Sequence, residues 1–237
     1  MTNSIIKIHS FDIFDTVLTR CVIRPQDIFF LMQKQLTTMG VPVQLVQQFP
    51  RIRVRAELWV RFNGVSKGLE EIKLVNIYER IGKQFDLNEQ QVHNLMQLEM
   101  STEDASIVPI QHTLDLIEIA RQQGQKIIFI SDMYLPLTFI QHVLVRIQAY
   151  HPQEDSIYLS NEHCFTKASG ALFKYVLKDQ QCLPEEVCHL GDDWHSDVAV
   201  PHRLGIKVYG VDLGRLKLSV GRGIINKCSR LIELLNV

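Results

Sequence analysis

The feature that most constrains the fold is a regular alternation of short apolar segments and helical segments along the second half of the chain. The apolar segments are rich in β-branched and aromatic residues, and the stretches between them repeat apolar residues every three or four positions. The apolar segments are KIIFIS (126–131), SIYLS (156–160), VCHL (187–190) and KVYGV (207–211). Strands that alternate with helices in this way form right-handed βαβ units, so the pattern predicts an α/β protein with a parallel sheet.

A further strand is expected near the N-terminus, where an apolar run from Ile5 to Phe11 ends at acidic residues. Between residues 21 and 104 the periodicity stays helical and no strand pattern interrupts it. We therefore predict an α/β core from residues 1–20 and 105–215, split by an all-helical insertion at residues 21–104. The last segment, residues 216–237, has the spacing of an amphipathic helix. We expect it to pack on the core, to form an interface, or to lead to a further domain or partner.

The composition excludes several classes of protein. Twenty-five basic residues against 26 acidic ones give a formal net charge of -1, so no overall field attracts nucleic acid. No stretch approaches the roughly 18 apolar residues that a transmembrane segment needs, and the N-terminus lacks the pattern of a signal peptide. The five cysteines include no CxxC pair, which argues against a disulfide framework or a zinc site. We expect a soluble cytoplasmic protein, with export without a signal peptide left open.

Polar residues follow the predicted strands at positions that should lie close together. In an open parallel sheet, ligands bind beyond the carboxyl ends of the strands. The residues at these ends are Asp12 in FDIFDT, Ser131 in FISDMY, Lys167 in TKASGALF, and Asp192, Asp193 and Asp197 in GDDWHSD. Each has a purely structural explanation when taken alone, since Ser131 or Asp132 could cap a helix, Lys167 could be solvated, and the acids could favour a helix N-terminus.

In this order, at successive strand ends, the four phrases resemble the motifs of the haloacid dehalogenase (HAD) superfamily. FDIFDT and FISDMY together look like a subgroup of predicted hydrolases. The resemblance covers the predicted core and not the insertion. It implies a Rossmann-like α/β fold, a helical cap at the insertion, and phosphatase chemistry through an aspartyl-phosphate. Asp12 would be the nucleophile, Ser131 would bind a phosphoryl oxygen, and Lys167 would neutralise charge.

The resemblance also implies a magnesium ion. Transfer of a dianionic phosphoryl group to a carboxylate brings like charges together, so cations must neutralise them, and Mg²⁺ prefers oxygen ligands. The expected metal site comprises Asp12, the backbone carbonyl of Phe14 and Asp192, with Asp193 or Asp197 orienting water molecules. The substrate would contact Ser131, Asp132 and Lys167, and Thr16 would steady the loop after the first strand.

One departure from the family's pattern bears on the substrate. Where the family usually has a second Asp that serves as general acid, the chain has Phe14, and Asp15 follows at a position usually occupied by glycine. Without an acid, the leaving group departs nearly unprotonated, which suits a phenol of pKa about 10 better than an alcohol near the ~15.7 of water. Aryl phosphates, including phosphotyrosine in a protein, would then be preferred. If Asp15 or a cap residue acts as the acid, small phosphorylated molecules such as sugar phosphates are also candidate substrates.

Two other functions stay open. Members of the family that hydrolyse carbon–halogen bonds also lack the second Asp, although they have no need of the metal that the acids of GDDWHSD would hold. The chain could also be an inactive binding module that keeps the fold. In the insertion, one predicted helix carries Arg51, Arg53, Arg55 and Arg61, of which Arg51 and Arg55 are four positions apart and share a face. Arg55 is a candidate to contact an anionic or aromatic substrate group, and the alternative for these arginines is a solvated surface charge.

Overall fold

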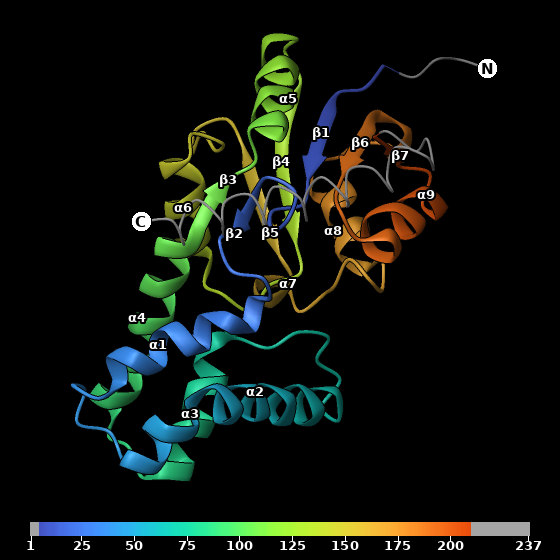
Figure 1. Ribbon diagram of the computed structural model, residues 1–237. Coiled ribbons are helices and arrows are strands. Elements are labelled where there is room, and N and C mark those ends of the chain that lie inside the picture. Colours follow the sequence, from blue (N-terminus) through green and yellow to red (C-terminus); the bar gives the residue numbers. More distant parts are fainter. Residues whose placement is uncertain (1–4, 210–237) are drawn as a thin grey trace.

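Five parallel strands form the central sheet, in the order β5-β4-β1-β6-β7 (Figure 1). The computed structural model describes residues 5–209. The strands are β1 (Ile8–Phe11), β4 (Lys126–Ser131), β5 (Ser156–Leu159), β6 (Val187–Leu190) and β7 (Lys207–Val208). The predicted α/β class with a parallel sheet is confirmed. The predicted helix at residues 216–237 lies outside the described residues.

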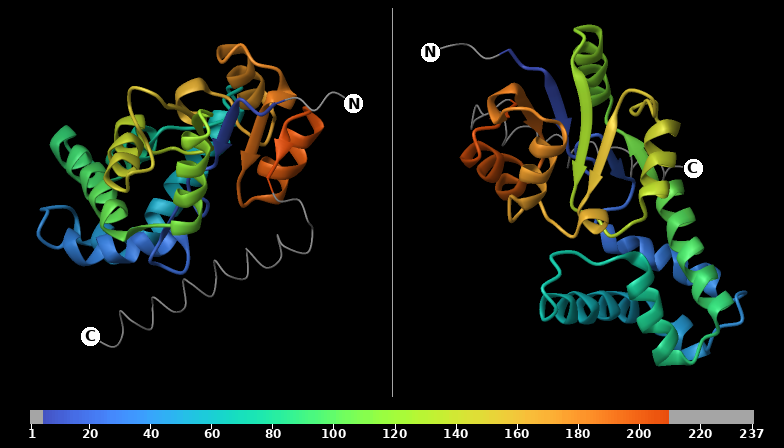
Figure 2. Two further views of the ribbon diagram at one scale, coloured as in Figure 1. Left: turned by 90° about the horizontal axis from the view of Figure 1, so that it is seen from above. Right: turned by 180° about the vertical axis from the view of Figure 1, so that it is seen from behind.

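Helices cover both faces of this sheet (Figure 2). They are α5 (Gln111–Gln122), α6 (Leu137–Arg146), α7 (Ser160–His163), α8 (Ala171–Asp179), the short helices η2 (Pro184–Glu186) and η3 (Trp194–Ala199), and α9 (Val200–Arg203). Side chains alternate along β4, so Ile127 and Phe129 join the hydrophobic cluster that includes α5 and α6, whereas Ile128 and Ile130 join the cluster that includes α8. Burial on both faces explains why the four central residues of KIIFIS, 127–130, are all apolar.

Helices fill the long stretch between the first and second predicted motifs. They are η1 (Pro25–Asp27), α1 (Ile28–Leu36), α2 (Val43–Val65), α3 (Leu74–Phe85) and α4 (Glu89–Ser106). We call η1 through α4 the helical insertion. It lies beyond the end of the sheet toward which β1 points, on the same side as the strand ends that carry the motifs (Figures 1 and 2).

A two-stranded antiparallel ribbon joins the helical insertion to the core. Its strands are β2 (Leu18–Arg20), where the chain leaves the core, and β3 (Ile107–Pro109), where it returns, and Arg20 pairs with Ile107. The sequence prediction missed both strands because three residues are too few to display a period of two.

An ion pair lies in the interior of the helical insertion, where the sequence suggested a row of surface arginines. Arg53 is fully buried, and its Nε and Nη2 each donate a hydrogen bond of 2.7 Å to the Glu99 carboxylate. The Tyr78 hydroxyl donates to the same carboxylate at 2.5 Å. The alternative of a solvated surface charge is therefore wrong for Arg53, whose charge is matched by Glu99 inside the helical insertion.

Within residues 5–209, no helix combines the length and the hydrophobicity that crossing a bilayer requires. The cysteines at 21, 164, 182 and 188 are all free thiols.

Candidate active site

Asp12 and Ser131 meet where two neighbouring parallel strands end. Asp12 follows β1 directly, and its backbone N–H donates to the carbonyl of Leu190 at the end of β6. Ser131 is the last residue of β4, the neighbour of β1 on the other side. Both side chains are buried, and the Ser131 Oγ donates to Oδ1 of Asp12 at 3.1 Å. The sheet therefore brings together two residues that lie far apart in the sequence.

Lys167 reaches the same carboxylate from the segment between α7 and α8. Its Nζ is buried and donates to Oδ1 of Asp12 at 2.5 Å and to Oδ1 of Asp197 at 2.6 Å. Burial by itself would lower the pKa of Lys167, but the two carboxylates outweigh it and raise the pKa above its ordinary value. Lys167 is therefore a permanent positive charge held between two acids.

The two oxygens of Asp12 have different surroundings. Ser131 and Lys167 both donate to Oδ1, whereas no residue in the described range 5–209 donates to Oδ2. Burial and the nearby Asp197 raise the pKa of Asp12, while Lys167 opposes them. One oxygen is thus fixed in place and the other is left to bind a cation or to attack an electrophile.

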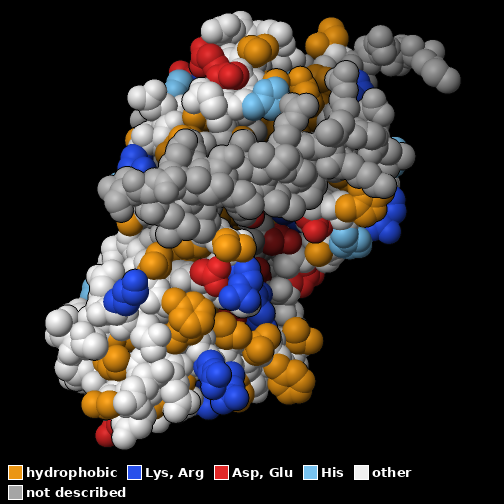
Figure 3. Space-filling view, viewed as in Figure 1, with side chains coloured by type: hydrophobic (Ala, Val, Ile, Leu, Met, Phe, Trp, Pro, Cys, Tyr) orange, Lys and Arg blue, Asp and Glu red, His pale blue; other side chains and the backbone are white. Residues whose placement is uncertain are grey.

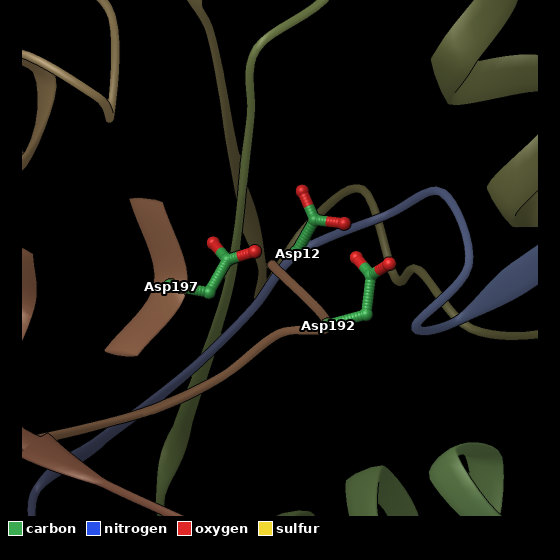
Figure 4. Close-up of side chains that lie close together, drawn as sticks. All are labelled: Asp12, Asp192 and Asp197. Carbon is green, nitrogen blue, oxygen red and sulfur yellow. The ribbon is translucent and has the colours of Figure 1, made fainter. Parts of the chain in front are cut away.

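Three carboxylates converge at this point. Asp12, Asp192 and Asp197 each offer an oxygen, and these atoms lie within 4.8 Å of one another. They come from the end of β1, from the loop after β6 and from η3 (Figure 4). Burial together with Asp12, Asp15 and Asp197 raises the pKa of Asp192 to about 7, so the local negative charge exceeds what Lys167 neutralises. An all-oxygen donor set with excess negative charge fits Mg²⁺.

In the space-filling view, acidic side chains gather between the core and the helical insertion, with basic and apolar side chains on the side of the insertion (Figure 3).

Asp197 is held by more donors than the sequence suggested. Besides Lys167, His189 Nε2 lies 3.0 Å from its Oδ1, and the backbone N–H of Asp193 donates to its Oδ2 at 3.1 Å. Although burial opposes ionisation, His189 and Lys167 lower the pKa of Asp197 below its ordinary range. Because an ionised carboxylate can only accept, His189 Nε2 carries the proton in this contact.

His189 in turn contacts Ser10, whose Oγ lies 2.8 Å from Nδ1. Both side chains are buried, on the neighbouring strands β6 and β1. Neither His189 nor Ser10 was among the residues predicted for the site. The available signal was that His189 lies on a strand directly before GDDWHSD.

Gly191 allows Asp197 to approach. A Cβ at position 191 would lie 2.2 Å from Cγ of Asp197, closer than atoms can pack. The turn of the chain after β6 therefore requires glycine, and the π-helix η3 that follows places Asp197 over it. Such helical bulges often occur at functional sites.

The side chain of Asp193 turns away from the acidic cluster. Asp193 caps η3, with Oδ1 accepting from the backbone N–H of Ser196 at 2.7 Å and from its Oγ at 2.9 Å. This is the role of a helix N-cap. Among the predicted metal ligands, the structure groups Asp12, Asp192 and Asp197, and leaves the Asp193 side chain outside that group.

The loop after Asp12 holds the three other residues predicted for the site. Asp15 has φ 59, in the left-handed region that glycine adopts readily, which explains the glycine usual at this position in the family it resembles. Its Oδ1 accepts from Thr19 Oγ1 at 2.6 Å. The ring of Phe14 lies 4.1 Å from the guanidinium carbon of Arg20. The Thr16 hydroxyl is buried and has no hydrogen-bond partner among the described residues, so that hydroxyl does not tie down the loop.

The two other predicted substrate contacts have different surroundings. Asp132 is partly buried, and its Oδ1 accepts from the backbone N–H of Lys167 at 2.7 Å. Burial raises the pKa of Asp132 to about 6. Arg55 is exposed on α2, and no contact within residues 5–209 connects it to Asp12. Its contact with a substrate stays a prediction.

Comparison of the sequence with protein-family models gives no match, and no curated protein matches it significantly. Solved structures do match. A 2-haloacid dehalogenase from Pseudomonas syringae aligns with 92% of this chain and 99% of its own, at TM-score 0.60 and 14% identity. The HAD family enzyme bt-2542 from Bacteroides thetaiotaomicron aligns with 90% of this chain and 98% of its own, at TM-score 0.57 and 16% identity.

The same Bacteroides enzyme has been solved in complex with magnesium and inorganic phosphate, and that structure covers 89% of this chain and 98% of its own at TM-score 0.54 and 17% identity. The HAD-hydrolase YfnB from Bacillus subtilis, bound to magnesium, covers 86% of each chain at TM-score 0.51 and 16% identity. With the sequence motifs placed together at one end of the sheet, these likenesses establish that the chain has the fold of the haloacid dehalogenase superfamily.

Proposed function

We propose that the chain is a magnesium-dependent phosphohydrolase that acts on phosphomonoesters through an aspartyl-phosphate at Asp12. One observation carries the proposal: a buried carboxylate has one oxygen fixed by Lys167 and Ser131, and two further acids lie within 4.8 Å. Magnesium and phosphate bound to a structural neighbour give it further support.

Each residue of the site has a role that follows from its contacts. Oδ2 of Asp12 attacks phosphorus, and the ester P–O bond breaks so that the leaving group departs with the bonding electron pair as an oxyanion. Lys167 and Ser131 hold Oδ1, so the carboxylate cannot rotate away from the substrate. Lys167 and the Ser131 hydroxyl lie where they can also meet the charge on the phosphoryl oxygens. Water then hydrolyses the aspartyl-phosphate, which releases inorganic phosphate and restores the carboxylate.

The proposed metal ligands are Asp12, Asp192 and the backbone carbonyl of Phe14, with Asp197 next to them. A bound Mg²⁺ would supply the positive charge that lets a dianionic phosphoryl group approach a carboxylate. Asp197 keeps Lys167 in line with Asp12, since one lysine nitrogen contacts both acids.

The residues around Phe14 bear on the leaving group. Arg20 contacts the Phe14 ring and is itself paired with Glu103 at 2.7 Å, and Asp15 accepts a hydrogen bond from Thr19. Phe14 has no proton to give a departing alkoxide, and Oδ1 of Asp15 is engaged by Thr19. We therefore propose that aryl phosphates, such as phosphotyrosine or small aromatic phosphates, react faster than alkyl phosphates. A sugar phosphate as the natural substrate would require an acid from the helical insertion.

We further propose that the helical insertion acts as a cap. It lies over the strand ends that carry the acids, and it contacts the loop after Ser131 through the Leu74 N–H, which donates to the Tyr134 carbonyl at 2.9 Å. A cap over this site would exclude water and select the substrate.

Hydrolysis of a carbon–halogen bond is the second candidate. Phe14 at the position of the usual general acid favours it, as does the dehalogenase from Pseudomonas syringae among the structural neighbours. The acidic cluster weighs against it, because displacement of a halide by Asp12 needs no metal. Chloride release from 2-chloropropionate in the presence of EDTA would support this candidate over phosphate hydrolysis.

Release of p-nitrophenol from p-nitrophenyl phosphate tests the main proposal. We expect release with Mg²⁺, none with EDTA, and none from the Asp12→Asn variant, which keeps the shape of the side chain and removes the nucleophile. Asp115→Asn is the matched control, because Asp115 is an exposed carboxylate on α5. Activity that survives EDTA or the Asp12 substitution would contradict the proposal, and inactivity of the wild type toward phosphate and halide substrates would favour a binding module.

A further inference from the structure

Two consecutive acids, Glu70 and Glu71, connect the helical insertion to the loops of the candidate site. They lie in the linker of residues 66–73 between α2 and α3, which runs between α2 and the core (Figure 1). We propose that Glu70 is a positioning residue for Lys167, so that the cationic side of the site is completed only when the helical insertion is docked on the core. This inference rests on the proposed function.

Glu70 binds one residue on each side of Lys167 in its loop, Thr166 before it and Ser169 two positions after it. One oxygen, Oε2, accepts from the Thr166 backbone N–H at 2.8 Å, from Thr166 Oγ1 at 2.9 Å and from Ser169 Oγ at 2.6 Å. The Ser169 hydroxyl, with Thr166, lowers the pKa of Glu70 below its ordinary value. Three donors on one carboxylate oxygen indicate a specific contact, since a solvated surface acid has none of them.

The loop that carries Lys167 has little regular structure of its own. It runs from Cys164 to Gly170, and both of these end residues have left-handed backbone conformations, with φ 58 and φ 79. From the core, Asp132 accepts from the Lys167 backbone N–H at 2.7 Å, and Asp12 and Asp197 accept from Lys167 Nζ. The helical insertion adds the three hydrogen bonds of Glu70, which hold the loop on either side of Lys167.

Glu71 holds the linker in place, and this fixes the position of its exposed neighbour Glu70. Its side chain is buried, with Oε1 accepting from Arg61 Nη1 at 2.5 Å and Oε2 accepting from Ser160 Oγ at 3.1 Å. The same Ser160 Oγ accepts from the Met133 N–H at 2.8 Å, in the loop after Ser131. Glu71 thus anchors the linker on the core, and its neighbour Glu70 is held facing Thr166 and Ser169.

The geometry couples docking of the helical insertion to the position of the Lys167 ammonium. If the insertion moves away from the core to admit a substrate, the Glu70 contacts break and the loop loses its ties on that side. When the insertion returns, the loop is fixed again and Lys167 Nζ is held between Asp12 and Asp197. Glu70 itself contacts neither of these acids, so its effect on the reaction passes through the loop.

Kinetics of p-nitrophenyl phosphate hydrolysis with Mg²⁺ test the proposal on the full chain. We expect Glu70→Ala to lower kcat about tenfold, equivalent to about 1.4 kcal/mol, with KM within about twofold of the wild type. Glu70→Gln should lose less, because its amide oxygen accepts from the same donors. Glu79→Ala, at an exposed acid of α3, should behave as the wild type. A rise in KM with unchanged kcat would overturn the proposal, since it would mean that Glu70 contacts the substrate.

A double-mutant cycle identifies the route of the effect. If Glu70 acts through Ser169, the Glu70→Ala/Ser169→Ala double variant should lose no more than about twofold in kcat relative to Glu70→Ala alone. Fully multiplicative losses would show that the two residues act independently and would overturn the proposal.

Hydrogen–deuterium exchange provides a readout that does not depend on activity. In Glu70→Ala, the peptide covering residues 160–172 should exchange faster than in the wild type, and the peptide covering β4 should be unchanged. Equal exchange of the 160–172 peptide would overturn the inference whatever the kinetics. If instead the wild type hydrolyses no phosphate ester but the exchange changes as expected, the proposed function fails while the contact between Glu70 and the loop stands.

Discussion

Asp132→Asn should make the folded protein more stable at neutral pH, although Asp132 lies in a candidate motif. Partial burial raises the pKa of its carboxyl from the ordinary 3.8 to about 6. Because each pKa unit corresponds to about 1.4 kcal/mol, the ionised side chain destabilises the folded state by about 3 kcal/mol above that pH. The asparagine Oδ1 can still accept from the backbone N–H of Lys167. A neutral amide oxygen makes weaker hydrogen bonds to the loop N–H groups than a carboxylate does, which costs about 1 kcal/mol. The expected net gain is about 2 kcal/mol.

The pH dependence has a definite sign. A carboxyl whose pKa is higher in the folded state than in the unfolded state binds more protons when folded, so this group favours folding as the pH decreases from 7 toward 4. The advantage of the asparagine variant should therefore be about 2 kcal/mol at pH 7.5 and close to zero near pH 4.5, where the folded carboxyl is protonated.

Urea denaturation at these two pH values, in EDTA to remove metal ions, measures the effect. The free energy of unfolding is compared for the wild type, for Asp132→Asn, and for Asp115→Asn as an exposed control on α5. A difference that is the same at both pH values would refute the electrostatic reasoning. An Asp132 variant that is less stable than the wild type at pH 7.5 would refute it as well.

Three further predictions concern charge, metal and packing. Arg53→Ala should cost about 3 to 5 kcal/mol of unfolding free energy, because it leaves a buried carboxylate unpaired, whereas Arg55→Ala on the exposed face of the same helix should change it by less than about 0.5 kcal/mol in urea denaturation. Mg²⁺ at about 100 times its Kd should stabilise the wild type by about 2.7 kcal/mol in thermal denaturation, and Asp192→Asn should abolish most of that gain. Gly191→Ala should lower kcat for p-nitrophenyl phosphate at least tenfold, because the added Cβ displaces Asp197; wild-type kinetics in that variant would contradict the packing argument.

The core and the centre of the site could be predicted because both depend on local patterns. Alternating strands and helices specify a parallel sheet, and a parallel sheet brings the carboxyl ends of its strands to one edge. Asp12, Ser131 and Lys167 were therefore predicted as neighbours, and Ser131 and Lys167 each donate a hydrogen bond to Asp12.

Contacts that depend on docking of one part on another could not be predicted in this way. Glu70 and Glu71 look like two solvated acids in the sequence, because their partners Thr166 and Ser160 lie about ninety positions away. Arg53 looked like a surface charge for the same reason, since Glu99 reaches it only once α2 and α4 are packed together. The periodicity of apolar residues predicts which face of a helix is buried, but it does not predict which charged residue on that helix forms a buried ion pair.

The paired strands β2 and β3 have a consequence for how this architecture can change. Since Arg20 and Ile107 are direct partners in that ribbon, the chain departs from the core and rejoins it at adjacent points. Segments whose two ends lie side by side can be exchanged for longer, shorter or unrelated ones without disturbing the host. The strand ends with their acids could thus stay constant while different insertions were joined to the core through the β2–β3 ribbon. Each insertion would surround Asp12 with different side chains and so favour a different ligand.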